Sequence, residues 1–184
     1  MIAIDCEGVQ VTGEGNKSQD LAASVAIVDV KGQLLFHCFV NHSDKKVNNI
    51  SRATGIKPED MERSCVTLPW LQDFLKEFTK HRPKLIGAGI HNEYKFLDLP
   101  PYQDAVDIHS FYYRDDGTPI ALELLGQRFA DELKWKKKIG EQHQAIHDAR
   151  LTMKLYNLYQ QLKDDVTFID KIRTTAGYDG CDGS

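Results

Sequence analysis

A stripe of leucines near the end of the chain defines its longest expected helix and brings an acidic residue into the core. The leucines run from Leu151 to Leu162 at spacings of three or four residues, which predicts one apolar face on a helix over residues 145–162. Asp148 lies about one turn before this stripe on the same face, near the helix N-terminus. Because an unpaired buried carboxylate is costly, Asp148 requires a partner such as a cation.

Short apolar runs upstream of this helix predict a sheet. Strands are expected, in chain order, over residues 2–7, 21–30, 34–40, 84–89 and 105–111. A tight turn at Lys31-Gly32 makes the second and third of them a hairpin. The polar stretch 11–20, which contains glycines, is expected to be a loop.

After Asn41 the pattern becomes helical. Helices are expected from Pro58, around residues 71–78, over residues 92–97 and around residues 122–129. Three early strands are thus followed by helices that alternate with two further strands. This order predicts an α/β fold in which helices flank a central, mixed, five-stranded sheet.

The length of 184 residues suits one domain. Residues 1–163 are expected to form it, and residues 164–184 to add a C-terminal helix and, over residues 177–184, a frayed tail. No long apolar run or secretory signal is visible, so no membrane association is expected. Four cysteines without CxxC or CxxH spacing favour a reducing, intracellular setting, nuclear or cytoplasmic. The expected state is a monomer.

Two acids at the end of the first expected strand form the first candidate site. Asp5 and Glu7 are two residues apart, so their side chains point to the same face of the strand. Two like charges this close need neutralisation, and oxygen-only ligands favour Mg²⁺ or Mn²⁺. Taken alone, the pair also fits a solvated strand end.

A histidine and an acid form the second candidate site. His143 precedes the helix that carries Asp148. Histidine titrates near neutral pH, which suits removal of a proton from water. His147 is nearer to Asp148 in sequence but points about 100° away from it on a helix, so His143 is the preferred base. A surface histidine before an ordinary helix is the alternative.

Glu93 is the third candidate. The expected strand over residues 84–89 runs into a glycine-containing turn and then into a helix that opens on Glu93. A further carboxylate is thereby placed where a neighbouring strand ends. The alternative is an acid that only stabilises the helix N-terminus. The net charge of −4 argues weakly against a nucleic-acid substrate, because two divalent cations would neutralise the four candidate carboxylates.

In this order the three segments resemble the motifs of the DEDDh exonuclease superfamily, whose fold is ribonuclease H-like. Residues 4–9, Ile-Asp-Cys-Glu-Gly-Val, look like D-C-E-M-V of the branch with the interferon-induced exoribonucleases and the eukaryotic RNA-processing exonucleases. Residues 89–95, Gly-Ile-His-Asn-Glu-Tyr-Lys, are similar to A-I-H-N-D-F-K. Residues 143–156 are close to H-S-x-V-E-D-A-R-x-x-M-x-L-Y, and Asp107 fits an acidic strand position between these motifs. The resemblance spans about residues 2–160.

The resemblance implies a 3′→5′ exonuclease with two divalent cations, Mg²⁺ or Mn²⁺. It assigns one cation to Asp5, Glu7 and Asp148, and the other to Asp5 and Glu93. His143 is the implied general base for the attacking water. The expected substrates are the 3′ ends of single-stranded RNA or DNA, with RNA favoured, and the expected products are nucleoside 5′-monophosphates.

Two positions depart from the family pattern. Glu93 stands where most relatives have aspartate, and because it remains an oxygen ligand we expect an altered metal preference rather than loss of activity. Gly8 replaces the usual methionine, which in relatives packs against the terminal base. We expect this glycine to leave its backbone exposed and to loosen selection of the 3′ nucleotide.

Two groups of residues are expected to contact nucleic acid. The first two motifs contribute Gly8, Val9, His91 and Asn92. A basic segment with one aromatic residue precedes His143, where it is suited to neutralise phosphates and stack a base: Lys134, Trp135, Lys136, Lys137 and Lys138. These lysines also fit the negative end of a helix.

Two other functions stay open at this point. A catalytically weak or inactive nucleic-acid-binding module can have the same fold. A protein-interaction domain would carry Asp5 and Glu7 as surface acids. Tyr112 and Tyr113 are expected to pack rather than to line a groove.

Overall fold

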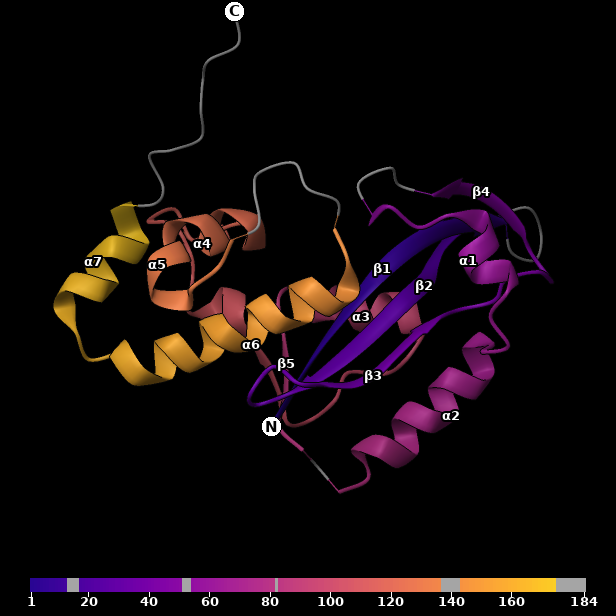
Figure 1. Cartoon of the computed structure of the whole chain (residues 1–184), viewed down its shortest axis with the longest axis horizontal. Coiled ribbons are helices and arrows are strands. Elements are labelled where there is room, and N and C mark those ends of the chain that lie inside the picture. Colours follow the sequence, from indigo (N-terminus) through magenta and orange to yellow (C-terminus); the bar gives the residue numbers. More distant parts are fainter. Residues whose placement is uncertain (13–16, 51–53, 82, 137–142, 175–184) are drawn as a thin grey trace, which may run out of the picture.

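The computed structural model describes residues 1–12, 17–50, 54–81, 83–136 and 143–174. The strands are β1 (Ile2–Thr12), β2 (Ser18–Asp29), β3 (Leu34–Phe39), β4 (Lys46–Ile50), β5 (Leu85–Gly87) and β6 (Ala105–Asp107). They lie in the order β3-β2-β1-β5-β6, and β4 pairs with β1 (Figure 1). β5 runs parallel to β1 and β6, whereas the other pairs are antiparallel. The expected α/β fold with a mixed sheet is confirmed.

Helices cover both faces of this sheet (Figure 1). They are α1 (Pro58–Glu62), α2 (Leu68–Thr79), α3 (His91–Leu97), α4 (Leu122–Arg128), α5 (Ala130–Leu133), α6 (Ala145–Leu162) and α7 (Val166–Thr174). α6 has the bounds that the leucine stripe predicts. It contacts β1 and β2, and α4 and α5 pack against it. Within the ranges described, none of the helices combines the length and the apolar character that crossing a bilayer requires.

Alternation along β1 divides the core into two layers. Ala3 belongs to the layer under α6, while Ile2 and Ile4 belong to the layer under α2 and α3. Burial on both faces explains the continuous apolar start of this strand. Side chains alternate along a strand, so Asp5 and Glu7 follow Ala3 on the face that α6 covers.

The first two strands are longer than the sequence suggests. β1 continues to Thr12 and β2 begins at Ser18, and these two residues are opposite each other in the ladder. The expected loop over residues 11–20 is therefore wrong at both of its ends, and residues 13–16 lie outside the described ranges. Hydrogen bonds between the strands hold polar residues that intrinsic preference assigns to a loop.

Strand β4 was not expected, and it makes the sheet six-stranded rather than five-stranded. Its residues lie within the segment for which a helical pattern was expected, so that expectation is wrong there. β4 pairs antiparallel with the end of β1, from Val9↔Ile50 to Thr12↔Lys46. β4 is short and mostly exposed, so its conformation depends on this pairing and not on its own pattern.

Strand β6 is shorter than expected because Asp107 ends it. The Asp107 Oδ1 accepts hydrogen bonds from the backbone N–H groups of Gly89 and His109, each at 2.9 Å. The second bond opens a short 3-10 helix, η3 (Ile108–Ser110), where the strand was expected to continue. The first bond fixes the turn before α3, in which Gly89 has a φ of 75° that glycine adopts readily.

Tyr112 and Tyr113 have different environments. Tyr112 is fully buried, and its hydroxyl donates a 2.9 Å hydrogen bond to the backbone carbonyl of Leu155 in α6. This confirms packing for Tyr112, whereas Tyr113 is 48% exposed. The Tyr112 hydroxyl thus ties the segment after β6 to the helix that carries Asp148.

We expect Tyr112→Phe to lower the free energy of unfolding by about 1–3 kcal/mol, because the Leu155 carbonyl loses its buried donor. Urea unfolding of both proteins measures this difference. Tyr113→Phe is the matched control, and we expect it to unfold like the parent. Equal loss of stability in both variants would contradict the assigned role of the Tyr112 hydroxyl.

The C-terminal helix expected after residue 163 is present as α7. Its Phe168 and Ile172 are buried in the layer under α6, and Ile169 packs against that layer. The expected frayed tail, residues 177–184, lies outside the described ranges. The division into residues 1–163 and 164–184 stays a prediction.

Candidate active site

Strand β1 and helix α6 bring three candidate residues together. Asp148 is in the first turn of α6 and only 5% exposed. Glu7, His143 and Asp148 each offer a ligand atom, and these atoms lie within 4.8 Å of one another. The sequence spacing joins His143 to Asp148 and the family resemblance adds Glu7, and the structure brings these three residues together. Asp5 and Glu93 are not part of this three-residue group.

The group lies where one edge of β1 is open. Along that edge β1 pairs with β5 only at Ile2 and Ala3, and with β4 only from Val9 onward. Residues 4–8 therefore have no neighbouring strand on that side within the described chain. On the opposite edge the ladder with β2 shifts its register between Glu7 and Gly8. Asp5 and Glu7 thus lie in the part of β1 that is between two paired segments on this edge.

His143 and Asp148 form a hydrogen-bonded pair. The distance from His143 Nδ1 to Asp148 Oδ2 is 3.0 Å, and the imidazole is partly exposed whereas the carboxylate is buried. An ionised carboxylate can only accept hydrogen bonds, so Nδ1 carries the proton of a neutral His143. Nε2 is then the atom that accepts a proton. His147 is exposed, in agreement with its expected direction away from Asp148.

Glu93 opens α3 in a buried environment. It is 4% exposed, and its burial raises the pKa of the carboxyl group to about 8, with smaller contributions from the negative charges of Asp107 and Glu7. In the absence of a cation, this carboxyl group therefore holds a proton at neutral pH. A cation nearby would favour its ionised form. The chemistry of this position thus fits a metal ligand.

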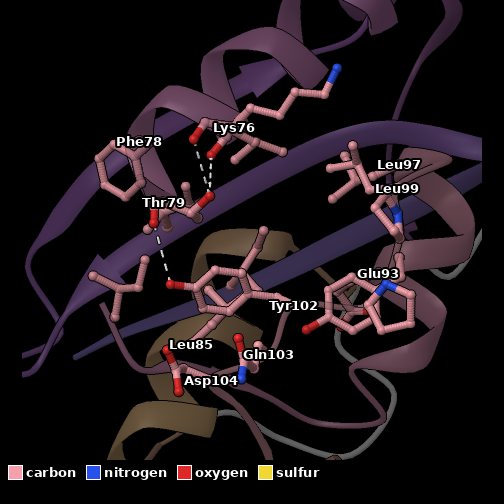
Figure 2. A pocket seen from close by; sticks show the side chains of 17 residues that line it. Lys76, Phe78, Thr79, Leu85, Glu93, Leu97, Leu99, Tyr102, Gln103 and Asp104 are labelled. Atoms are coloured by element: carbon pink, nitrogen blue, oxygen red, sulfur yellow. Dashed lines mark hydrogen bonds between the residues drawn. The ribbon is translucent and has the colours of Figure 1, made fainter. Parts of the chain in front are cut away.

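An apolar cavity of about 240 Å³ contributes to the burial of Glu93. Figure 2 shows its walls: Phe78 and Thr79 come from α2, Leu97 from α3, and Tyr102 from the loop before β6. The Tyr102 hydroxyl donates a 3.3 Å hydrogen bond to the Thr79 carbonyl. Because these walls are mostly apolar, they offer Glu93 little solvation, which agrees with the direction of its pKa shift.

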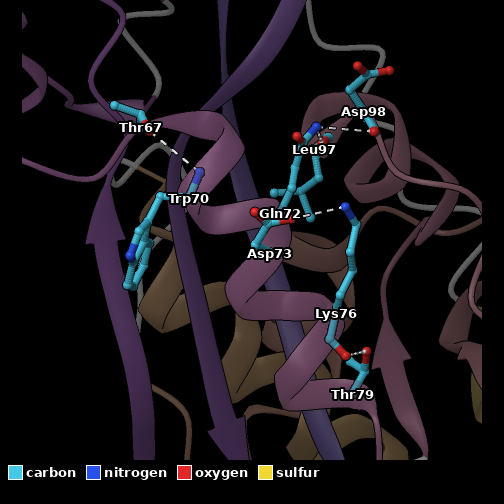
Figure 3. Close-up of polar contacts among 8 residues, drawn as sticks. All are labelled: Thr67, Trp70, Gln72, Asp73, Lys76, Thr79, Leu97 and Asp98. Atoms are coloured by element: carbon cyan, nitrogen blue, oxygen red, sulfur yellow. Dashed lines mark hydrogen bonds and ion pairs between the residues drawn. The ribbon is translucent and has the colours of Figure 1, made fainter.

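Helix α3 is anchored at its C-terminus by α2. The Gln72 side-chain amide donates to the carbonyls of Leu97 at 2.9 Å and Asp98 at 3.2 Å (Figure 3). These carbonyls lie at the end of α3, where Asp98 is left-handed with a φ of 50°. Together with the Asp107 bonds at the preceding turn, both ends of α3 are held. The position of Glu93 relative to β1 is fixed by this arrangement.

A groove of about 380 Å³ opens over residues 6–10 of β1. It is lined by Cys6, Glu7, Gly8, Val9, Gln10, Asp20, Asn49, Thr54, Phe96 and His143. Two of these, Glu7 and His143, belong to the three-residue group. A ligand in the groove therefore lies directly beside the candidate catalytic residues.

Comparison with known proteins agrees with this site. The exonuclease family model, RNase T, matches residues 2–156, which include all five candidate catalytic residues. The chain belongs to this exonuclease family. Its membership confirms the resemblance to the DEDDh exonucleases.

Curated relatives of this exonuclease family member carry RNA in their names. RNA exonuclease 4 of Xenopus laevis is 29% identical over 161 residues, which are 85% of this chain and 36% of that protein. RNA exonuclease 4 of Homo sapiens is 30% identical, over 84% of this chain and 36% of that protein. Small RNA degrading nuclease 2 of Arabidopsis thaliana is 28% identical, over 84% of this chain and 34% of that protein. The chain thus spans about a third of the length of these relatives.

Solved structures confirm the fold. The Pan2 pseudoubiquitin hydrolase–RNA exonuclease module of Saccharomyces cerevisiae, solved with AAGGA RNA, superposes with a TM-score of 0.78 at 18% identity. The match covers 96% of this chain and 31% of that chain. The Pan2 catalytic unit of Neurospora crassa superposes with a TM-score of 0.75 at 19% identity. The match covers 97% of this chain and 29% of that chain. The ribonuclease H-like fold expected from the motifs is therefore present in this exonuclease.

The residues expected to contact nucleic acid lie in different environments. His91 and Asn92 are exposed at the start of α3, and Gly8 and Val9 line the groove, although Val9 itself is buried. Gly8 is not the open backbone that the sequence suggested. A Cβ atom built there would lie 3.0 Å from two ring carbons of Phe96, so that ring covers the glycine.

The basic segment is only partly described. Lys134 and Lys136 are exposed, whereas Lys137 and Lys138 lie outside the described ranges. The Trp135 ring packs against Gly126 of α4, and the Lys154 ammonium lies 5.6 Å from the ring centroid. Trp135 thus packs at the edge of the core, and stacking of a base on it stays a prediction.

Sequence reasoning missed several residues of the groove and its surroundings. Ser24 is opposite Glu7 in the β1–β2 ladder, and its hydroxyl lies 3.1 Å from His37 Nε2. Thr54 and Asn49 reach the groove from the segment around β4. Phe96 follows Glu93 by three residues and carries no signal of its own in the sequence. Only their shared location beside β1 identifies these residues.

Proposed function

We propose that this exonuclease family member is a metal-dependent 3′→5′ exoribonuclease that releases nucleoside 5′-monophosphates from single-stranded RNA. The observation that carries the proposal is the meeting of Glu7, His143 and the buried Asp148 at the open edge of β1. Glu93 adds a buried carboxyl group within electrostatic reach of Glu7. Such a concentration of acids is suited to cations and, through them, to phosphate.

The donor set fits two divalent cations, Mg²⁺ or Mn²⁺, because every proposed ligand is a carboxylate oxygen. Asp5, Glu7 and Asp148 would hold the first, and Asp5 with Glu93 the second. When bound, the cations supply electrophilic stabilisation of the negative charge that develops at the phosphodiester, and they lower the pKa of water. The raised pKa of Glu93 supports this assignment, because that carboxyl group otherwise carries a buried proton.

The chain's own residues supply the proton transfer. The His143 Nε2 accepts the proton of the attacking water, while its Nδ1–H donates to Asp148. This hydrogen bond orients the imidazole and stabilises its charged form after proton transfer. The walls of the groove hold the terminal nucleotide beside His143 and Glu7.

The choice of RNA rests on the names of the relatives, RNA exonuclease 4 and small RNA degrading nuclease. Single-stranded DNA is the comparison substrate. The described cysteines, Cys6, Cys38 and Cys65, are free thiols, which fits an intracellular setting in the nucleus or cytoplasm. We propose a monomer as the active unit.

The direct test uses a 20-nucleotide RNA labelled at either its 3′ or its 5′ end, with matched DNA and duplex controls. We expect labelled mononucleotide to appear first from the 3′-labelled strand, only with Mg²⁺ or Mn²⁺. The 5′-labelled strand should shorten stepwise. If the protein bound RNA but released no nucleotide with either Mg²⁺ or Mn²⁺, the alternative would be supported, a catalytically inactive nucleic-acid-binding module.

Replacement of the proposed base gives a second test. We expect His143→Ala to lower kcat by roughly 10²- to 10⁴-fold, because the water loses its proton acceptor. The affinity for Mn²⁺, measured by calorimetry, should change far less, since the carboxylates remain. His147→Ala is the matched control on the exposed side of α6 and should keep the parent's kcat. Full activity of His143→Ala would exclude His143 as the base.

A further inference from the structure

The Phe96 ring has an unusual neighbour in Gly8. Phe96 lies on α3, three residues after Glu93, and is partly buried. A Cβ atom at Gly8 would lie 3.0 Å from both the Cε1 and the Cζ of the ring, closer than most real contacts of a Cβ. The ring can therefore approach the backbone of β1 this closely only because residue 8 has no side chain.

This contact joins two elements that are distant in sequence at the open edge of β1. The apolar layer under α2 and α3, which includes Cys6 and Leu97, packs against part of Phe96. That packing restricts the rotamers of the ring. Phe96 also lines the groove that contains Glu7 and His143. A rigid aromatic surface is thus presented to the groove beside the residues proposed for catalysis.

We propose that Phe96 is the stacking platform for the base of the 3′-terminal nucleotide, and that Gly8 provides the space for it. The inference rests on the proposed function. Stacking on an aromatic side chain favours every base, since each has a π face, and contributes roughly 5- to 150-fold in affinity per base. A base held on Phe96 leaves its own 5′ phosphodiester free to reach the group formed by Glu7, His143 and Asp148.

Stacking on Phe96 should accept any of the four bases at the 3′ end of the RNA, but it requires that a base is present. Among the described groove-lining residues, Phe96 is the one aromatic side chain apart from the imidazole of His143. The other walls offer carboxylates, amides, a hydroxyl, a thiol and aliphatic groups. We therefore expect little discrimination among the four terminal bases and strong discrimination against a terminal nucleotide that lacks its base.

The test is a cycle that removes the ring from the protein and the base from the substrate. The substrates are RNA strands that differ only in the 3′ nucleotide, which is either adenosine or an abasic ribose. We expect Phe96→Ala and Phe96→Leu to lower kcat/KM on the adenosine strand by roughly 5- to 150-fold, mostly through KM. On the abasic strand the variants should differ from the parent by less than about 3-fold, because there is no base left to stack. Phe96→Trp should restore stacking.

Two controls separate this loss from a general effect on α3 and from the loss of an aromatic ring elsewhere in the protein. Phe96→Leu keeps an apolar side chain against the buried layer, and its thermal unfolding is compared with the parent. Tyr113→Leu removes an exposed ring that lines neither the apolar cavity nor the groove, so kcat/KM should stay near the parent value. Equal losses on adenosine and abasic strands, or parent activity of Phe96→Ala, would overturn the inference. If the parent protein releases no nucleotide at all, the proposed function itself is wrong.

Discussion

Asp148→Asn is expected to abolish metal-dependent release of nucleotides, with a fall in kcat/KM of at least ~10³-fold. The substitution keeps the shape of the side chain but replaces an anionic ligand with a neutral amide. It also removes the charge that stabilises the imidazolium form of His143 after proton transfer. Release from 3′-labelled RNA at saturating Mn²⁺ measures the loss, and calorimetry measures the Mn²⁺ affinity.

A matched control distinguishes the loss of a metal ligand from the loss of one negative charge. Asp164 follows α6 and is exposed, so Asp164→Asn changes the net charge equally without touching the site. We expect this variant to release nucleotides at the rate of the parent protein. If Asp148→Asn kept the Mn²⁺ affinity and the activity of the parent protein, Asp148 would not be a metal ligand.

Glu93→Gln is expected to lower activity by at least ~10²-fold and to stabilise the metal-free protein. The lower activity follows from loss of an anionic ligand. The higher stability follows from burial, which raises the pKa of the Glu93 carboxyl group from an ordinary 4.5 to about 8. Glutamine occupies the same space without an ionisation that burial opposes.

The pH dependence of this stabilisation has a definite sign. Between pH 4.5 and about 8 the unfolded chain has released the Glu93 proton while the folded protein still holds it. The contribution of Glu93 to stability is therefore retained below pH 4.5 and is lost as the pH rises to about 8. With EDTA present, the free energy of unfolding of Glu93→Gln should exceed that of the parent protein at pH 8 by on the order of 4 kcal/mol. Near pH 4.5 the two values should be equal.

Urea unfolding at these two pH values, with and without Mn²⁺, makes the measurement. Added Mn²⁺ should reduce the difference in the free energy of unfolding between Glu93→Gln and the parent protein at pH 8. The reason is that a cation stabilises ionised Glu93 in the folded parent protein. Glu93→Asp keeps a carboxylate and should retain activity with a changed ratio of Mg²⁺- to Mn²⁺-supported rates. Parent activity of Glu93→Gln would show that Glu93 is not a ligand.

Much of the fold follows from local patterns in the sequence. The leucine stripe predicts the bounds of α6, and it predicts correctly that Asp148 is buried. Hydrophobic periodicity is a local property, so a long amphipathic helix is readable without its partner. The order of strands and helices likewise leads to the mixed sheet, and the spacing of Asp5 and Glu7 fixes their common face.

The errors occur where one segment depends on a distant one. β4 is a strand because the end of β1 offers it a pairing edge, and its own residues predict otherwise. β6 ends at Asp107 because that side chain binds the N–H groups of Gly89 and His109. Hydrogen-bond partners of this kind are not encoded in the local pattern.

For the candidate site, the sequence by itself determined which acids and which histidine are available and on which elements they lie. Only the tertiary structure decided how close Glu7, His143 and Asp148 lie to one another, that Glu93 is desolvated, and that Phe96 covers Gly8. Ligand geometry, dielectric environment and close packing arise from contacts between segments far apart in the chain. A sequence pattern specifies the chemical groups, and the packed fold sets their distances and their pKa values.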